Sequence, residues 1–280
     1  MTDKELEVFA LAIRKRIIKM AYECNCNAHL GGALSMVDIL AVLYGDVLRN
    51  AGGSYDERDK FILSKGHGAL ALFATLGEKG MICEERLHTY LADGSNLCAH
   101  PVMEPEIGIE SSNGSLGQGI SMAVGMALSS KRKQRTDQIF TIVGNGESDE
   151  GLVWEAIASA SQFQLDNLTV ILDDNKFQND GASEQILYYP NYKERFAAFG
   201  FDVIEINGNH IPEIVQALHT PHIEDKPRAI VANTVKGCGI SFMENDNSWH
   251  HNRLTQKYYE QAMNCLLYTS DAADDLIGVD

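Results

Sequence analysis

The sequence predicts an α/β protein with a doubly wound, mostly parallel sheet and helices on both faces. From residue 138 onward, short apolar runs alternate with helical stretches. These runs are continuously apolar, as in strands that are covered on both faces. The 280 residues, 45% of them hydrophobic, suffice for one large domain or two small ones. No repeat and no Pro/Gly/Ser linker divides the chain, so we expect one domain.

Helical patterns fill the first third of the chain. Apolar residues recur at helical spacing through residues 6–22. Ser35, with Asp38 three residues later, forms a capping-box pattern that predicts a helix through Leu48. Two further helices are expected at and after the glycine-rich turns, within Gly66–Leu76 and Gly114–Arg135.

The later elements alternate in type. We expect strands at Ile139–Val143, Leu168–Leu172, Val203–Ile206 and Ala229–Val235. We expect helices at Leu152–Phe163, Tyr192–Phe199 and Ile211–His219. Strands joined in this way run parallel, with right-handed crossovers.

The end of the chain departs from these patterns. The sequence up to Met263 fits the end of an amphipathic helix, but Leu266–Asp280 does not continue it. That segment resembles translated adapter sequence from the end of a sequencing fragment, and a flexible acidic C-terminus is the alternative. We therefore assign the fold to residues 1–264 and expect residues 265–280 to be non-native or disordered.

Composition excludes several classes of function. The net charge of -16 disfavours nucleic acid or an anionic membrane as the main partner. No apolar run approaches the roughly 18 residues that span a membrane, and residues 1–15 lack the apolar core of a secretory signal. The six scattered cysteines are too few for a disulfide scaffold and lack the spacing of zinc sites. We expect a protein of the reducing cytoplasm.

Polar residues follow two of the expected strands. Gly144–Glu147 follows the strand at 139–143, and Asp173–Gln178 follows the next one. Both turns lie at the carboxyl edge of a parallel sheet, where ligands bind. A glycine-rich turn into a helix lets backbone N–H groups approach a phosphate. Side-chain oxygens of Asn145 and Asn175 can converge there on one hard cation such as Mg²⁺.

These turns and their flanking residues resemble the N-terminal, thiamine-diphosphate-binding half of transketolases. The family pattern G-D-G, E-G, W-E-A, L-x-N-L and D-x-N corresponds here to Gly144–Gly146, Glu150-Gly151, Trp154–Ala156, Leu165–Leu168 and Asp173–Asn175. The resemblance implies thiamine diphosphate and Mg²⁺, or Ca²⁺ or Mn²⁺ in its place. It implies cofactor contacts by Gly144, Asn145, Gly146, Glu147 and Asn175, and metal ligation by Asn145, Asn175 and Phe177.

Asn145 departs from the family, which has a metal-binding aspartate at this position. Asparagine keeps an oxygen donor but loses the negative charge, so we expect weaker Mg²⁺ binding. Three accounts stay open: a single-base change or sequencing error, a functional natural variant, and loss of activity.

Four histidines lie in sequence motifs that are typical of the family. These motifs are Ala28–Gly32, Leu63–Gly68, Cys98–Pro101 and Ser248–His250. The resemblance implies that His29, His67, His100 and His250 surround the diphosphate and the reacting sugar, with His67 and His250 also binding the cofactor. Because His251 is adjacent to His250, either residue can match the histidine of the last motif. Four other histidines match no motif of the site, and we expect them to be structural: His88, His210, His219 and His222.

A further turn and two acids complete the predicted site. Residues 111–119 resemble the family's T-G-P-L-G-Q-G turn, in which Gly114 would contact the cofactor through its backbone and Leu116 through its side chain. Glu150 and Glu155 lie where the family has carboxylates that link two active sites across a dimer. A solvated helix start is the alternative interpretation of Glu150.

The resemblance covers residues 4–263 but only half of a catalytic machine. We expect no counterpart in these 280 residues of the family's second domain, which binds the aminopyrimidine ring and carries the activating glutamate. The resemblance therefore implies the N-terminal subunit of a split transketolase, with a pyrimidine-binding C-terminal partner subunit in a dimer or heterotetramer. Such an enzyme would transfer a two-carbon ketol unit from a ketose phosphate to an aldose phosphate.

Three other functions are alternatives to this interpretation. Another thiamine-diphosphate enzyme subunit, similar to 1-deoxy-xylulose 5-phosphate synthase or to a 2-oxo-acid dehydrogenase alpha subunit, is disfavoured by the histidine set. A nicotinamide enzyme is disfavoured because no G-x-G-x-x-G follows a first strand. A non-catalytic subunit stays possible because of Asn145.

Overall fold

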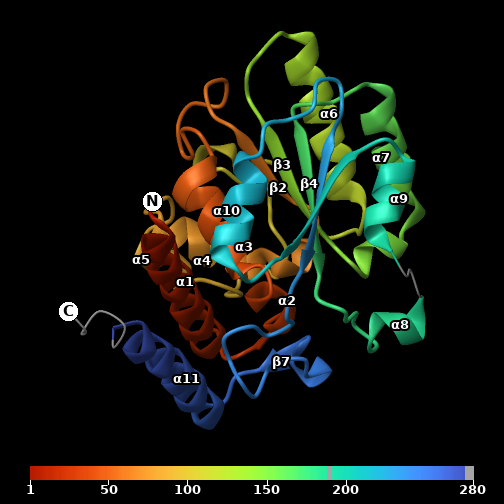
Figure 1. Ribbon diagram of the computed structural model, residues 1–280. Helices are drawn as coiled ribbons and strands as arrows, with labels where there is room; N and C mark the ends of the chain where they lie inside the picture. The colour runs from red at the N-terminus through yellow and green to blue at the C-terminus, as the bar shows by residue number, and fades with distance from the viewer. Residues whose placement is uncertain (188–190, 275–280) are drawn as a thin grey trace, which may run out of the picture.

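The computed structural model describes residues 1–187 and 191–274, with side chains up to residue 267 (Figure 1). Its main sheet has five parallel strands in the order β2-β3-β4-β6-β5. The strands are β2 (Lys60–Leu63), β3 (Ile139–Gly144), β4 (Leu168–Asp174), β5 (Asp202–Asn207) and β6 (Arg228–Asn233). The predicted doubly wound parallel sheet is confirmed.

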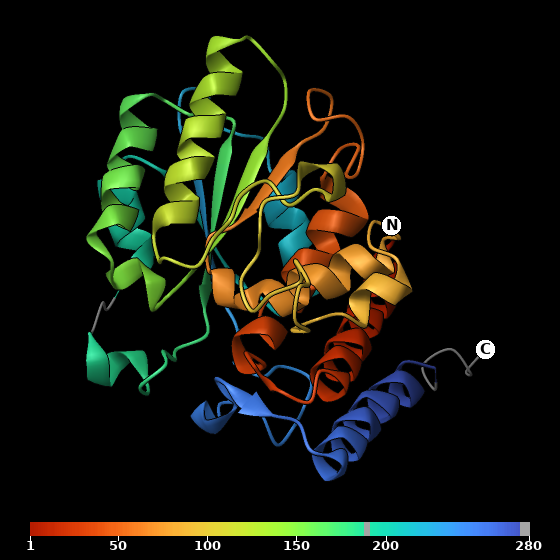
Figure 2. The same cartoon turned by 180° about the vertical axis from the view of Figure 1, so that it is seen from behind.

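Helices cover both faces of the sheet, as Figures 1 and 2 show. One face carries α6 (Gln118–Arg132), α7 (Gly151–Gln162) and α9 (Tyr192–Ala198). The other carries α1 (Asp3–Glu23), α3 (Val37–Val42), α4 (Ala69–Glu78) and α10 (Ile211–His219). Neighbouring strand residues alternate between the two cores: Ile142 packs in the core under the second set of helices, and Val143 in the core under the first.

Strand β2 was not expected from the sequence, in which the strand at residues 139–143 is the first to stand out. The run is only four residues long and begins with a lysine, so its local pattern does not suggest a buried strand. The structure buries Lys60 completely and pairs Lys60 with Asp137, 77 residues further along the chain. Long-range pairing of a buried charge leaves no periodic signal.

The predicted capping box is also wrong. The chain forms a short helix α2 (Gly31–Leu34), and α3 then begins after Met36 and ends in a π-helical turn at Leu43–Val47. Ser35 Oγ donates to Asp173 Oδ2 at 2.7 Å, and Asp38 accepts two bonds from Arg14. Both polar groups are engaged in tertiary contacts that a local motif cannot reveal.

The C-terminal helix α11 (Gln256–Asp274) extends beyond the expected end of the pattern. Leu266 is 1% exposed and packs against the core, so the expectation that the helical pattern stops before this residue is wrong. The helix also packs on α1, where the Tyr22 and Tyr259 rings stack with centroids 4.4 Å apart. The native origin of residues 265–280 stays a prediction, and residues 275–280 lie outside the described residues.

A second, two-residue ladder joins the two ends of the chain. Strand β1 (Asn27–Ala28) pairs antiparallel with β7 (Asn252–Arg253), and Ala28 lies opposite Asn252. The ladder places the segment after β1 beside the loop that precedes β7. The remaining short helices are α5 (Glu84–Leu87) and α8 (Ser183–Ile186), and 3-10 turns occur at 66–68, 105–107, 147–149 and 247–249.

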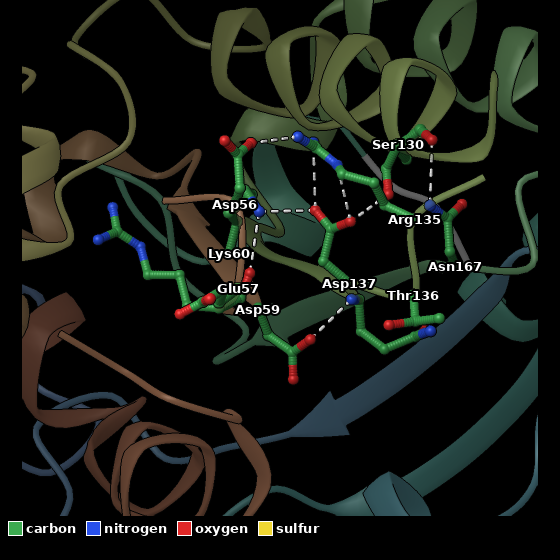
Figure 3. Close-up of polar contacts among 12 residues, drawn as sticks. Asp56, Glu57, Asp59, Lys60, Ser130, Arg135, Thr136, Asp137 and Asn167 are labelled. Atoms are coloured by element: carbon green, nitrogen blue, oxygen red, sulfur yellow. Dashed lines mark hydrogen bonds and ion pairs between the residues drawn. The ribbon is translucent and has the colours of Figure 1, made fainter. Parts of the chain in front are cut away.

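A network of charges closes the amino edge of the sheet (Figure 3). Lys60 Nζ donates to Asp137 Oδ2 at 2.6 Å, and Ser130 Oγ donates to the other carboxylate oxygen. Arg135 Nε also contacts Asp137 Oδ1 at 3.2 Å, and its Nη1 reaches Asp56 at 2.8 Å. The network ties the starts of β2 and β3 to the end of α6. In the part of the chain that the structure describes, no helix is long and apolar enough to cross a membrane.

Candidate active site

A cavity of about 330 Å³ opens at the carboxyl edge of the sheet. It is lined by most of the residues that the sequence predicted for the site. These are His29, His67, His100, Gly114, Leu116, Gly144, Asn145, Gly146, Glu147, Asn175, Phe177 and His250. Segments that are as far apart in the chain as residues 29 and 250 therefore meet in one place.

Two predicted residues lie outside this cavity. Glu150 precedes α7 and Glu155 lies on it, and both are exposed. Five residues line the cavity without having been predicted from the sequence: Gly32, Lys65, Gln178, Asn179 and Lys236. Lys65 and Lys236 lie within motifs that were recognised for their histidines or glycines. The sequence therefore contained a pattern from which a site role of these two lysines could have been predicted.

A larger recess of about 520 Å³ lies beside this cavity, beyond Phe177. Its lining includes acids and lysines from the ends of β4 and β5 and from α8 and α9 and, among the described residues, contains no histidine. Size alone therefore does not identify the reactive site, and the smaller cavity holds the catalytic side-chain types.

Four imidazoles form a cluster in the cavity. The His29 ring lies with its centroid 5.7 Å from that of His67, 5.8 Å from that of His100 and 5.6 Å from that of His250. The centroids of His67 and His250 are 5.7 Å apart. His29 follows β1, His67 lies in the turn after β2, and His250 precedes β7. The β1–β7 ladder and the end of β2 thus bring the rings together.

Burial lowers the pKa of every histidine in this cluster. The pKa of His29 falls to about 3 and that of His250 to about 4, because of burial first and neighbouring cationic groups second. Burial also lowers the pKa of His67 and His100. The rings are therefore neutral near pH 7, and a neutral imidazole can both donate and accept a hydrogen bond. This suits proton transfer and the binding of sugar hydroxyls.

Two lysines give the cavity its positive character. Lys65 Nζ pairs with Asp173 and donates to the Gly32 carbonyl at 2.8 Å. Lys236 Nζ lies 3.0 Å from His250 Nδ1 and also donates to neutral oxygens. Among the described residues no carboxylate lies within ion-pair distance of Lys236, and burial, together with the charge of Lys65, lowers its pKa to about 8. This arrangement suits an anionic ligand such as a diphosphate.

Glu147 fastens two glycine-rich turns of the cavity to each other. Its Oε1 accepts from Ser64 Oγ at 2.6 Å and from Gly117 N at 2.9 Å, and its Oε2 accepts from Gly144 N at 3.1 Å. Burial raises its pKa. Gly117 has a φ of +81°, which favours glycine and sharply turns the chain into α6. The bonding shows that Glu147 orders the turns, and direct contact with a cofactor stays a prediction.

The predicted metal ligands lie side by side but carry no charge. The β3–β4 register sets Gly144 opposite Asp173, so Asn145 and Asn175 follow neighbouring strand ends. Asn145 Nδ2 donates to Ser183 Oγ at 2.7 Å, and Asn175 Oδ1 accepts from Phe177 N at 3.1 Å. In the described ranges, no group of three or more His, Cys, Asp or Glu side chains is arranged to hold a metal ion. The donor set fits a divalent cation only if a bound diphosphate supplies negative charge.

Comparison with known proteins agrees with this geometry. The transketolase thiamine diphosphate binding domain matches residues 10–271. The chain is 36% identical over 266 residues to one subunit of an apulose-4-phosphate transketolase from Phocaeicola vulgatus, covering 94% of each chain. It is 40% identical over 240 residues to one subunit of a 6-deoxy-6-sulfo-D-fructose transketolase from a Clostridium species, covering 84% of this chain and 86% of that one.

Solved structures show how much of a full-length enzyme the chain represents. The transketolase of Campylobacter jejuni superposes with a TM-score of 0.86 at 28% identity, covering 95% of this chain but 43% of the other. The chain thus spans less than half of this full-length transketolase and nearly the whole of the separately named transketolase subunits. It belongs to the transketolase family, in which it corresponds to the N-terminal, thiamine-diphosphate-binding subunit.

Proposed function

We propose that the chain is the cofactor-binding half of a split transketolase, which moves a two-carbon ketol unit from a ketose phosphate to an aldose phosphate. The observation that supports this most is the cavity itself, in which four neutral imidazoles and two lysines meet at the carboxyl edge of the sheet. Bound thiamine diphosphate would supply a nucleophilic carbon and an electron sink for breaking a C–C bond beside a carbonyl.

The diphosphate would be held by the inner part of the cavity. Lys236, the rings of His67 and His250, and the backbone of Gly146 line this space and would supply the donors, because the N–H groups of Gly144 and Asn145 are already bonded to Glu147 and to the Asp173 carbonyl. Gly114 would contribute its backbone, and the partly exposed Leu116 an apolar contact with the cofactor. Charge-assisted hydrogen bonds of this kind are the strong ones in proteins.

His29 and His100 would act on the sugar. Both rings line the cavity within 6 Å of each other, and neither has an acidic partner within ion-pair distance among the described residues. A neutral ring can accept a proton from a sugar hydroxyl or return one, which contributes typically 10²- to 10⁴-fold to such reactions. Holding the hydroxyls in place would also orient the bond that breaks.

A divalent cation, Mg²⁺ first, would bind between the diphosphate and the amide oxygens of Asn145 and Asn175, with the Phe177 carbonyl as a further ligand. The neutral donor set supports a weak site that depends on the diphosphate. Because Asn145 lacks the negative charge of the family's aspartate, a second candidate function is that of a subunit which binds the cofactor without supporting turnover.

A partner subunit would complete the site. Relatives of similar length are named as subunits of transketolases, and full-length transketolases extend well beyond the matched region. We infer a pyrimidine-binding partner in a heterotetramer, with the exposed Glu150 and Glu155 at a contact between active sites. The substrates would be anionic sugars, as the relatives' names describe for apulose 4-phosphate and a sulfo-sugar. Six free cysteines support a cytoplasmic setting, where pentose phosphates occur.

Reconstitution tests this proposal. The chain would be purified with the product of a neighbouring reading frame that carries a pyrimidine-binding half, then assayed with thiamine diphosphate, Mg²⁺ and a panel of ketose and aldose phosphates. We expect ketol transfer that falls at least about 100-fold in His29→Asn and His100→Asn. The surface variant His210→Asn is the matched control and should retain activity. Cofactor binding without transfer in any pairing would identify a non-catalytic subunit instead.

A further inference from the structure

His251 stands next to His250 but occupies a different place. His250 lines the cavity and bonds to Lys236, whereas His251 is exposed and is not part of the cavity lining. Its ring nevertheless packs on His29, with centroids 4.4 Å apart and an interplanar angle of 34°. His251 therefore extends the imidazole cluster outward, from His29 to the solvent-exposed rim.

The small antiparallel ladder fixes this position. Ala28 lies opposite Asn252, so continuing the same register by one residue sets His29 opposite His251. Directly opposed residues of antiparallel strands have neighbouring side chains. Arg253 bonds to Asn25 on the far side of the ladder and holds its other end. The contact between the two rings is thus a property of the backbone pairing.

The cavity that His29 lines, and on whose rim His251 packs, is poor in free negative charge. Among the described residues, the one acid that lines the cavity is Glu147, whose oxygens are already bonded to Ser64 and to two backbone N–H groups. Within the same part of the chain the His251 ring has no hydrogen bond or ion pair. The rim therefore presents an imidazole without an internal anion to bind.

We propose that His251 binds the terminal tetrahedral oxyanion of the sugar substrate, at the end remote from the reacting carbonyl. This inference rests on the proposed ketol transfer. The reacting end of the sugar must reach the cofactor past His29 and His100, so the remainder of its carbon chain extends outward over His29. A phosphate or sulfonate there meets the imidazole N–H of His251, which makes this residue a determinant of substrate specificity.

Paired substrates test the proposal in the assembled enzyme. One ketose would be assayed with and without its terminal phosphate, and a sulfonate analogue would distinguish the two oxyanions. A charge-assisted hydrogen bond of about 1.5–3 kcal/mol corresponds to at least about a tenfold loss of kcat/KM for the phosphorylated sugar in His251→Asn. We expect that loss to lie in KM, no change for the unphosphorylated sugar, and recovery to within about threefold in His251→Lys. His210→Asn, which changes an exposed histidine outside the cavity lining, is the matched control.

Equal losses on both sugars, or no loss on either, would overturn the proposal. A second measurement separates it from the proposed function. Inorganic phosphate and inorganic sulfate would be titrated into the full chain while the ring signals of His251, assigned by their absence in His251→Asn, are followed by NMR. Shifts of these signals without any ketol transfer would refute the proposed function and still support an anion site. Unshifted signals would count against the anion site whatever the enzyme's activity.

Discussion

At the amino edge of the sheet, the buried charges are paired within the chain. At the carboxyl edge Lys65 is likewise paired with Asp173, but Lys236 faces an open cavity and, among the described residues, has no carboxylate within ion-pair distance. Lys60 and Asp137 pair at 2.6 Å with almost no exposed surface, and Arg58 pairs with Glu110 at 2.8 Å in the same way. At the opposite edge, Lys236 and four imidazoles line a space whose wall carries Glu147, an acid with both oxygens already bonded.

This difference distinguishes groups that stabilise the fold from groups that are kept for a ligand. A buried charge that lacks a partner costs stability, so a fold retains one mainly where binding requires it. The net charge of -16 makes the contrast stronger, because the anion-binding edge is a local exception in an acidic chain. Each edge should therefore respond differently to mutation, pH and metal.

The largest effect is expected at the amino edge, in Asp137→Ala. This change leaves Lys60 buried without its carboxylate and also removes the partner of Ser130 and Arg135. We expect the free energy of unfolding to fall by about 3–5 kcal/mol. Urea denaturation of the purified chain measures it. Asp56→Ala is the control, because its side chain is 80% exposed and its pair with Arg135 should contribute less than about 1 kcal/mol. Equal losses in the two variants would contradict the comparison.

An intermediate effect is expected at the carboxyl edge as the pH falls. The pKa values of His29 and His250 are about 3 and about 4 in the folded chain, and the pKa values of His67 and His100 are also lowered. The unfolded chain therefore binds more protons below its ordinary histidine pKa of about 6.5, and stability decreases from there down to about pH 4. Partial exposure weakens the linkage, so we expect a loss of about 2–3 kcal/mol between pH 7 and pH 5.

Urea denaturation at the two pH values measures this loss, and variants assign it to the cluster. His250→Asn cannot take up the proton, so the fall should become smaller by about 0.5–1 kcal/mol. His210→Asn removes an exposed histidine beside Glu213 and should leave the fall intact. A wild-type chain that is equally stable at pH 5 and pH 7 would show that the folded cluster takes up protons as readily as the unfolded chain does.

The smallest effect concerns the charge missing from the metal site. Asn145→Asp restores a carboxylate beside Asn175, and we expect Mg²⁺ to bind at least about tenfold more tightly in the presence of thiamine diphosphate, about 1.4 kcal/mol. Calorimetric titration of Mg²⁺ measures the gain. Asn179→Asp adds the same charge to the lining of the same cavity and should give less. Equal gains would indicate a general field effect rather than ligation.

Much of the fold could be predicted because its later elements are local. Residues 139–143 and 211–219 carry continuous or periodic apolar patterns that need no distant information. Strand β2 and the role of Ser35 could not be predicted, because Lys60 and Ser35 are held by Asp137 and Asp173 from far along the chain. In these cases tertiary pairing decides the structure.

The candidate site was predicted from sequence motifs, and this explains which of its residues the prediction missed. Twelve residues given a site role line the cavity, and most of them stand in motifs that the family shares. Lys236 and Lys65 lie inside such motifs, yet their function depends on what faces them, namely His250 for one and Asp173 for the other. The sequence leaves the register between His250 and His251 open, whereas in the structure His250 lines the cavity and the β1–β7 ladder sets His251 beside His29.

The β1–β7 ladder also has a consequence for biosynthesis. His29 leaves the ribosome early, but its cluster needs His250, and β7 ends only at Arg253. At about 5–20 residues per second, the intervening segment takes on the order of 10–45 s to synthesise. The sheet and its amino-edge network are complete in sequence before then. A nascent chain that ends before β7 therefore contains all five strands of the described main sheet but not the complete imidazole cluster, and a product truncated there would also lack α11, which packs on α1.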